Sequence, residues 1–384
     1  MRQLTDAIFM LIPRIALNHI KKKVTPGKVV ILTGARRVGK TFLISQYLKS
    51  LNEKYILWNG EDFAVHDLLK RRSVQHYKNI LGDTKFLVID EVQKIPDIGN
   101  VLKLIVDNFQ DLKVLVSGSS AFDISNETGE PLTGRKKEIT LFPISESELR
   151  PLENPQERFD NLCLRLVFGN MPEIFSLSSI KDKAEYLREI VNSYLLKDIL
   201  AFESLRNSDK LFALLKLVAL QIGKEVSLQE LGRQLAMSKN TIERYLDILS
   251  KVFIIYKLTG FSRNLRKEIV KNSKWYFYDN GIRNAILANF NLINNREDIG
   301  MLWENYMMSE RLKYNHYNEV IYNKYFWRTY DKQEIDLIEE KGGKLYAFEF
   351  KWKPAKIKIP TAWKTSYPDS EFNQVNSENY FDWV

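Results

Sequence analysis

Residues 34–41 combine a phosphate-binding spacing with a lysine and a hydroxyl. Gly34 and Gly39 bracket four residues, and Lys40 and Thr41 follow at once. Glycines let the backbone wrap around phosphates, and successive N–H groups at a helix start supply donors and positive potential. Lys40 would reach the β and γ phosphates, and the Thr41 hydroxyl would ligate Mg²⁺. The pattern predicts a P-loop for Mg·ATP made of Gly34, Ala35, Arg36, Arg37, Val38, Gly39, Lys40, Thr41 and Phe42.

Two adjacent carboxylates, Asp90 and Glu91, follow the apolar run at residues 86–89. Asp90, at the end of a buried strand, would hold the magnesium ion through water, and Glu91 would orient and deprotonate the attacking water. A helix N-cap is the alternative for such a pair, but it does not usually follow four consecutive apolar residues. The pair therefore predicts ATP hydrolysis, and the glutamate base separates the pattern from that of GTPases.

A second apolar run, residues 114–116, ends in hydroxyl groups at Ser117 and Ser119. Either hydroxyl could contact the γ-phosphate or the attacking water as a sensor. The alternative is that serine and glycine only form a turn here.

The C-terminal part carries the spacing Asp…Glu-x-Lys. Asp336 lies in one β-rich run, Glu349 and Lys351 lie in the next, and Gly342-Gly343 separates the two. Residues two apart on a strand share a face, so Glu349 and Lys351 would face Asp336 across a hairpin. Asp336 and Glu349 would bind Mg²⁺, and Lys351 would polarise the water or stabilise the developing phosphate charge. Together they would form a minimal nuclease site. Glu304, in an amphipathic segment upstream, is a further candidate.

Two simpler interpretations of these charges remain open. The residues could form an exposed cross-strand salt bridge, or belong to a nuclease-like fold kept as an interaction module. The lysines that follow would suit a track along a DNA backbone; they are Lys353, Lys356, Lys358 and Lys364.

The elements that must position these residues differ along the chain. Residues 29–33, 55–58, 86–89, 114–116 and 139–142 are short, continuously apolar runs, which is typical of strands buried on both faces. Helical segments, such as residues 41–51 and 101–109, lie between them. This alternation predicts a parallel, three-layer α/β sheet.

The pattern becomes helical from about residue 156 to 257, and β-rich runs return at residues 320–322, 325–329, 335–338 and 345–350. Residues 227–249 read as helix, turn, helix, with Ser227 as N-cap and Glu230 completing a capping box. An apolar run at 253–258 would add a wing strand, giving a winged helix over about 206–265. We expect domains at residues 1–155, 156–269 and 270–384.

The role of the winged helix is open between DNA binding and a structural or protein-contact role. In DNA binders the second helix enters the major groove. Its outward residues here carry little net positive charge: Lys239, Asn240, Glu243, Arg244 and Asp247. A basic run could supply phosphate contacts at the wing; it comprises Arg263, Arg266 and Lys267.

Composition bounds the protein class. The chain has 384 residues, one cysteine (Cys163) and a formal net charge of +9. The charge favours polyanion partners, or else reflects lysine and arginine on solvated helix faces. A single cysteine excludes an internal disulfide and suits a reducing cytoplasm. The apolar start is too short to span a membrane and lacks signal-peptide features, so we expect a cytoplasmic protein without membrane contact.

Several segments resemble the prokaryotic AAA+-type P-loop ATPases whose C-terminal half is a domain of unknown function with a restriction-endonuclease-like end. The Walker A run at 34–41, the Walker B run Asp-Glu-Val-Gln-Lys-Ile-Pro at 90–96 and Ser-Gly-Ser-Ser at 117–120 carry the likeness. It continues at residues 134–135, 169–173 and 274–281 and at the C-terminal Asp…Glu-x-Lys, and so covers nearly the whole chain.

The resemblance implies an AAA+-like α/β ATPase domain, a winged-helix middle and a restriction-endonuclease-like α/β end in which Glu304 matches a helical acidic residue. In such families an arginine acts on ATP in the same or a neighbouring subunit, which leaves a homo-oligomer open. Arg135 is the position we carry over; Arg36 and Arg37 compete for the role, and Arg135 could instead cap a helix or form a salt bridge.

The leading hypothesis is a Mg²⁺-dependent ATPase that acts on DNA and has a possible metal-dependent nuclease site. The competing hypothesis is an ATP-driven switch whose C-terminal domain is a catalytically inactive protein-interaction module.

Overall fold

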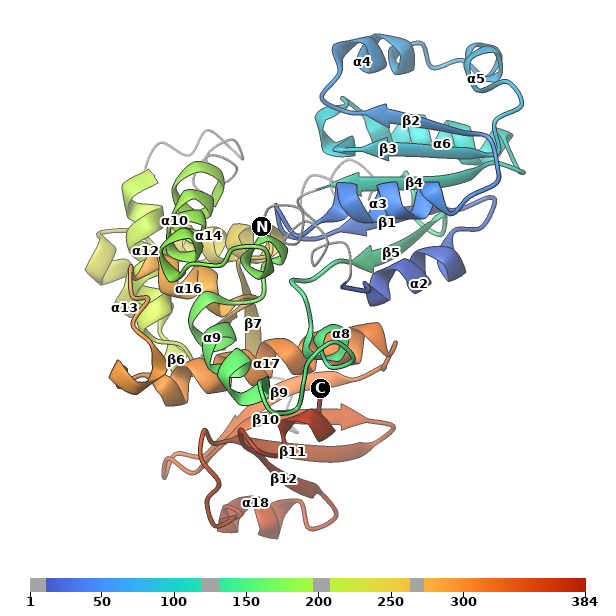
Figure 1. Ribbon diagram of the computed structural model, residues 1–384. Coiled ribbons are helices and arrows are strands. Elements are labelled where there is room, and N and C mark those ends of the chain that lie inside the picture. Colours follow the sequence, from blue (N-terminus) through green and yellow to red (C-terminus); the bar gives the residue numbers. More distant parts are fainter. Residues whose placement is uncertain (1–11, 119–130, 196–207, 263–272) are drawn as a thin grey trace. The chain divides into compact units, whose positions relative to one another are not determined.

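A computed structural model describes residues 12–118, 131–195, 208–262 and 273–384 (Figure 1). Contacts separate two compact units. The N-terminal unit comprises Pro13–Phe142 with Lys251–Phe253, and the C-terminal unit comprises Pro143–Ser250 and Ile254–Val384 together with Ile12. The boundaries expected near residues 155 and 270 stay predictions. Across the described ranges, no helix is both long and apolar enough to cross a membrane.

The N-terminal unit is built on the predicted parallel α/β sheet. Its strand order is β2-β3-β4-β1-β5, and every pairing is parallel. The strands are β1 (Val29–Thr33), β2 (Tyr55–Asn59), β3 (Phe86–Asp90), β4 (Lys113–Gly118) and β5 (Lys136–Thr140). The helices are α2 (Ile15–Lys23), α3 (Lys40–Lys49), α4 (Phe63–Lys70), α5 (Val74–Leu81) and α6 (Ile98–Asn108). Helices α4, α5 and α6 pack on one face of the sheet and close its main core.

The expectation that all five runs are strands buried on both faces was wrong for β2; the run at residues 139–142 is mostly buried, but only its first two residues belong to a strand, β5. β1 and β3 are buried throughout and β4 nearly so, whereas β2 and β5 are largely half-buried or exposed. The reason is their position, because each pairs with a single neighbour at an edge of the sheet. On β2, Tyr55 is 45% exposed and Leu57 51% exposed.

The C-terminal unit combines nine helices of the described chain with a mixed sheet. The helices are α8 (Glu146–Leu149), α9 (Arg158–Phe168), α10 (Ile180–Glu189), α12 (Ser208–Leu220), α13 (Leu228–Leu235), α14 (Lys239–Lys251), α16 (Asn280–Ile286), α17 (Ile299–Tyr317) and α18 (Thr361–Ser366). The seven-stranded sheet has the order β12-β11-β10-β9-β7-β8-β6. Its strands are β6 (Glu225–Val226), β7 (Ile255–Gly260), β8 (Ser273–Phe277), β9 (Asn323–Arg328), β10 (Glu334–Lys341), β11 (Lys344–Phe350) and β12 (Glu371–Val375).

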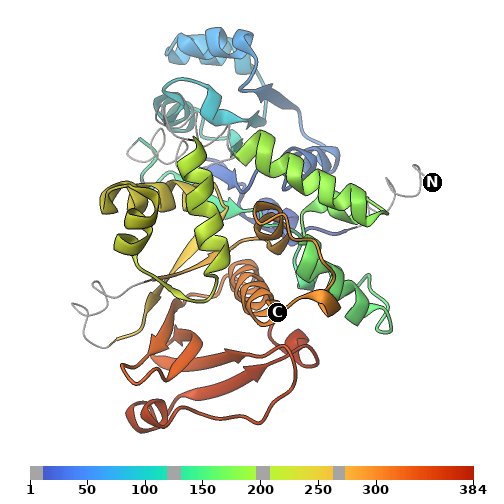
Figure 2. The same cartoon turned by 90° about the vertical axis from the view of Figure 1, so that its left-hand side faces the viewer.

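Helices α17 and α18 lie on opposite faces of the strands that carry the Asp…Glu-x-Lys residues (Figures 1 and 2). Trp363 of α18 packs in a core with Ala347 of β11. The guanidinium of Arg311, on α17, lies over the ring of Phe348, the next residue of β11. Successive strand residues point to opposite faces, so these two contacts fix the layers. The sheet is thereby enclosed between two helices.

One predicted strand, at residues 320–322, is absent, and these described residues have no regular structure. α17 ends just before them, and Glu319 has a positive φ of 52°. The Val320 N–H donates to the Asn315 carbonyl at 2.9 Å, which closes the helix end. The cap uses the residues that would have begun the strand, and β9 starts at Asn323 instead.

The two helices expected at residues 227–249 are present as α13 and α14. The Ser227 hydroxyl accepts the Glu230 N–H at 3.3 Å, as an N-cap does. The expected wing strand overlaps β7, which lies inside the large sheet between β9 and β8. The winged-helix assignment stays a prediction, and Arg263, Arg266 and Lys267 lie outside the described residues.

Candidate functional site

The P-loop residues follow β1 and open α3, as the spacing predicted. Gly34 and Gly39 have φ of 149° and 97°, in the region that favours glycine. A Cβ on Gly34 would lie 2.2 Å from the Leu141 carbonyl oxygen, so a side chain is excluded. Lys40 is 6% exposed. Its Nζ donates to the carbonyls of Gly34 at 2.9 Å and Ala35 at 3.0 Å. The ammonium group is therefore held within the loop.

Three strand ends converge beside this loop. The Thr41 hydroxyl donates to Asp90 Oδ2 at 2.6 Å. Ser117, fully buried at the end of β4, donates to Asp90 Oδ1. These contacts arise because β4 lies between β1 and β3, so the carboxyl ends of all three meet at one edge of the sheet. The structure brings Thr41, Asp90 and Ser117 together, while Ser119 lies outside the described residues.

Glu91 is the first residue after β3 and is half-buried. Its φ of 51° is unusual for a residue with a side chain. Its Oε2 accepts the Gln93 Nε2–H at 2.6 Å. No role was predicted for Gln93, although its place in the Asp-Glu-x-Gln spacing was the available signal.

Arg135 does not join this group within one chain. It precedes β5, and its carbonyl accepts the Val29 N–H at 2.8 Å at the start of β1, whereas the P-loop follows the end of that strand. Its Nε pairs with Asp107 Oδ1 at 2.6 Å. Within its own chain Arg135 therefore lies in an ion pair with Asp107, at the edge of the sheet opposite the P-loop. Action on a neighbouring subunit stays a prediction.

The C-terminal candidates are gathered around the β10–β11 hairpin. Asp336 lies on β10, and its Oδ2 accepts the Phe350 N–H at 2.9 Å. Glu349 lies on β11, and its Oε1 is 2.6 Å from Nζ of Lys351, one residue beyond the strand. Gly342 and Gly343 form the turn with positive φ. The predicted hairpin is present, with Asp336 and Glu349 on its two strands, but Lys351 lies beyond the strand on which it was expected.

Three further residues join this group, and none of them was predicted to belong to the site. Lys274 on β8 is 1% exposed and pairs with Glu334 and, at 3.8 Å, with Glu304. The Tyr276 hydroxyl donates to Glu304 Oε1 at 2.7 Å. No local spacing could reveal Lys274 and Tyr276, because β8 reaches the site only through the sheet, whereas Glu334 lies two residues before Asp336 on β10.

The group carries more carboxylates than cations. Burial and the neighbouring Asp336 raise the pKa of Glu304 to about 7. The same two causes raise the pKa of Glu349 to about 7, against the opposing effect of Lys351. Burial also raises the pKa of Asp336 itself. Excess negative charge at a buried site favours protonation or a bound cation.

The donor sets differ in how well they suit a divalent cation. A threonine hydroxyl and a carboxylate at 2.6 Å supply the hard oxygens that Mg²⁺ takes beside a nucleotide. In the described part of the chain, no three His, Cys, Asp or Glu residues are grouped so as to hold a metal. At the hairpin, Asp336 and Glu349 could therefore supply two ligands, with water or phosphate completing the shell.

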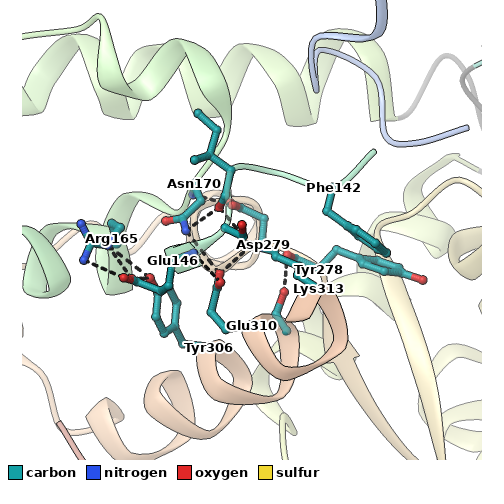
Figure 3. Close-up of polar contacts among 12 residues, drawn as sticks. Phe142, Glu146, Arg165, Asn170, Tyr278, Asp279, Tyr306, Glu310 and Lys313 are labelled. Atoms are coloured by element: carbon teal, nitrogen blue, oxygen red, sulfur yellow. Dashed lines mark hydrogen bonds and ion pairs between the residues drawn. The ribbon is translucent and has the colours of Figure 1, made fainter. Parts of the chain in front are cut away.

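The segments at 169–173 and 274–281 meet in a buried polar cluster (Figure 3). Asp279 accepts the N–H groups of Asn170 at 2.6 Å and Ile282 at 3.1 Å. A Cβ on Gly169 would lie 2.0 Å from Asp279 Oδ1, and one on Gly281 would lie 2.1 Å from the Phe168 carbonyl oxygen. Both segments therefore serve close packing within the C-terminal unit.

The same region holds buried ion pairs that anchor α8 (Figure 3). Arg165 Nε lies 2.8 Å from Glu146 Oε1, and both side chains are at most 4% exposed. Tyr306 also donates to Glu146. The Glu146 N–H donates to Glu310 at 2.8 Å, and Glu310 pairs with Lys313 at 2.6 Å. These contacts tie α8 and α9 to α17.

Three family models match successive parts of the chain. Residues 26–150 match a model described as AAA domain. Residues 160–292 and 299–373 match two models described as domains of unknown function, DUF8612 and DUF4143. The first match, with the geometry at Thr41 and Asp90, supports a P-loop AAA-type ATPase domain that binds and hydrolyses nucleotide.

The chain is also similar to uncharacterized proteins of other organisms. One from Mycobacterium tuberculosis is 27% identical over 88% of this chain and 73% of its own length. One from Haemophilus influenzae is 23% identical over 83% of this chain and 80% of its own. A solved Signal Transduction ATPase with Numerous Domains protein of Pyrococcus horikoshii shares 14% identity at a TM-score of 0.31, over 78% of this chain and 44% of that one. A TM-score this low carries no structural inference.

Proposed function

We propose that the N-terminal unit hydrolyses ATP in a Mg²⁺-dependent reaction. The observation that carries this proposal is the 2.6 Å contact between the Thr41 hydroxyl and Asp90 beside the P-loop. The loop N–H groups and Lys40 would bind the phosphates, while Thr41 and Asp90 would hold the cation, directly and through water. Glu91 would take a proton from the attacking water. The cation, when bound, neutralises phosphate charge.

Nucleotide binding tests this proposal directly. Titration with a fluorescent ATP analogue should show saturable binding to the wild-type chain and its loss in Lys40→Ala, which removes the charge that faces the phosphates. Lys49→Ala is the matched control, because this exposed lysine ends the same helix. Equal affinity in Lys40→Ala and the wild type would refute the site.

We further propose that ATP hydrolysis is coupled to DNA. The net charge of +9 and the exposed lysines 353, 356 and 358 after β11 support this proposal. The pair Asp336 and Glu349, with Lys351 alongside, would then cut DNA with a divalent cation. ATP turnover measured with and without single- and double-stranded DNA is the test, and DNA that leaves turnover unchanged would refute the coupling.

The competing proposal is an ATP-driven switch whose C-terminal end binds a protein partner. It is favoured by Lys351, which already pairs with Glu349, one of the two proposed metal ligands. A switch predicts unchanged ATP turnover on DNA addition and intact plasmid in every metal. A neighbouring subunit supplying an arginine to the nucleotide would fit either proposal.

A further inference from the structure

The proposed base, Glu91, is held by a side chain that lies two residues further on. Gln93 Nε2 donates to Glu91 Oε2 at 2.6 Å, a short hydrogen bond to a charged acceptor. A 3₁₀ turn over Val92–Lys94 makes this contact possible, and the Lys94 N–H donates to the Glu91 carbonyl at 3.0 Å. The turn brings the amide back onto the carboxylate.

The Glu91 backbone is fixed from a second direction, by the end of β2. The Gly60 N–H donates to the Asp90 carbonyl at 2.8 Å. A Cβ on Gly60 would lie 2.3 Å from the Glu91 carbonyl oxygen, so this approach requires a glycine. A ring nitrogen of His66 on α4 is 2.6 Å from the Gly60 carbonyl and holds that residue in turn. Backbone and carboxylate of Glu91 are thus both restrained.

We infer that Gln93 is a positioning residue that orients the Glu91 carboxylate to accept a proton from the attacking water. This inference rests on the proposed role of Glu91 as base. By holding Oε2, the amide fixes the direction in which Oε1 faces, and Oε1 is the oxygen that we expect to accept a proton from the water. A glutamate side chain rotates about several bonds, and without the amide it would spend much of its time in unproductive orientations. Misplacing a catalytic group by about 1 Å costs on the order of 100-fold in rate.

Gln93 lies outside the P-loop, so its loss should act on turnover and leave binding intact. We expect Gln93→Met, which keeps the length and removes the donor, to lower kcat by about 10- to 100-fold at unchanged KM. Gln75→Met is the matched control, because Gln75 lies on α5 of the same unit and bonds Asn79 on the same helix. Gln93→Asn, which keeps an amide, should recover part of the rate.

A double-mutant cycle separates positioning from general support of the fold. If Gln93 acts only through Glu91, then Glu91→Gln with Gln93→Met should turn over ATP as slowly as Glu91→Gln alone. Additive losses, or a wild-type kcat in Gln93→Met, would overturn the inference. If Glu91→Gln itself kept the wild-type rate, the assignment of the base would fail instead.

Discussion

Asp279 Oδ2 accepts the main-chain N–H of Asn170 at 2.6 Å, across a separation of 109 residues. The bond joins the turn after α9 to the start of α16, and Gly169 makes it possible because it has no side chain. This contact leads to a prediction about stability that does not depend on any proposed activity.

Gly169→Ala should destabilise the protein by about 3 kcal/mol or more, because overlap with a buried group is among the strongest destabilising mechanisms. The new Cβ would lie 2.0 Å from the Asp279 carboxylate, and the residue has φ of 70°. Urea unfolding would measure the loss. Gly343→Ala is the control, since its φ is 80° and nothing lies within 4 Å; it should cost about 1 kcal/mol. Equal losses of unfolding free energy in the two variants would show that the surrounding structure shifts to relieve the overlap at residue 169.

Acid should weaken a second buried contact of this unit. Burial alone would raise the pKa of Asp298, but hydrogen bonds from Arg296 and Arg283 lower it to about 2. A lowered pKa adds stability above the unfolded value near 4 and loses it as pH falls toward 2. Asp298→Asn should therefore cost about 2 kcal/mol at pH 7 and progressively less below pH 4. A penalty that did not change with pH would contradict the ion pairs as its cause.

Glu91→Gln should keep ATP bound and slow its hydrolysis by about 100-fold or more, because a positioned base contributes about that much. Binding survives since the phosphates are held by the P-loop and Lys40. Single-turnover hydrolysis and analogue binding, measured on the same preparation, would separate the two effects. Glu157→Gln, an exposed position at the start of α9, is the charge-matched control.

DNA binding should be largely independent of sequence and should weaken steeply with salt. About four phosphate contacts would lower affinity by about 100-fold between 50 and 200 mM salt. Replacing Lys353, Lys356 and Lys358 by glutamine should reduce the slope of log affinity against log salt concentration by about three. The same change at the exposed lysines 70, 78 and 103 of the N-terminal unit removes equal charge and should leave the slope unaltered. No binding at low salt with a non-hydrolysable ATP analogue would favour the protein-partner proposal.

Cleavage of supercoiled plasmid with Mg²⁺ or Mn²⁺ should be lost in Asp336→Ala and Lys351→Ala, while ATP hydrolysis persists because the two sites lie in separate units. Lys344→Ala, at an exposed position on β11, should keep cleavage. Chelator should abolish nicking in the wild type. Nicking that survives equally in both site variants would come from contamination, and none in any metal would leave a binding module.

The contact between Thr41 and Asp90 could be predicted from the sequence because each residue belongs to a local motif. Asp90 ends β3, and Thr41 lies at the start of α3, just after the loop that follows β1. A parallel sheet brings the carboxyl ends of its strands to one edge, so the two residues were expected to lie close together. Arg135 lies just before β5 and next to the start of β1, so the strand pairing places it away from the P-loop of its own chain, and its role as an arginine finger stays a prediction. Lys274 and Tyr276 reach the hairpin site only because β8 belongs to the same sheet. The spacing of residues along the sequence does not reveal such a contact. The cap that ends α17 likewise outweighed the β-rich composition of residues 320–322.

The pairing of β7 with β9 has a practical consequence for anyone who wishes to isolate the C-terminal end. Thr259 and Gly260 lie opposite Tyr325 and Phe326, so the sheet runs without interruption from the middle of the chain into its last strands. A truncated protein beginning near residue 270 would leave β9 with an open edge and an uncovered row of peptide groups. Such edges recruit other strands, so an excised fragment should aggregate, whereas one that also retains β7 should remain dispersed.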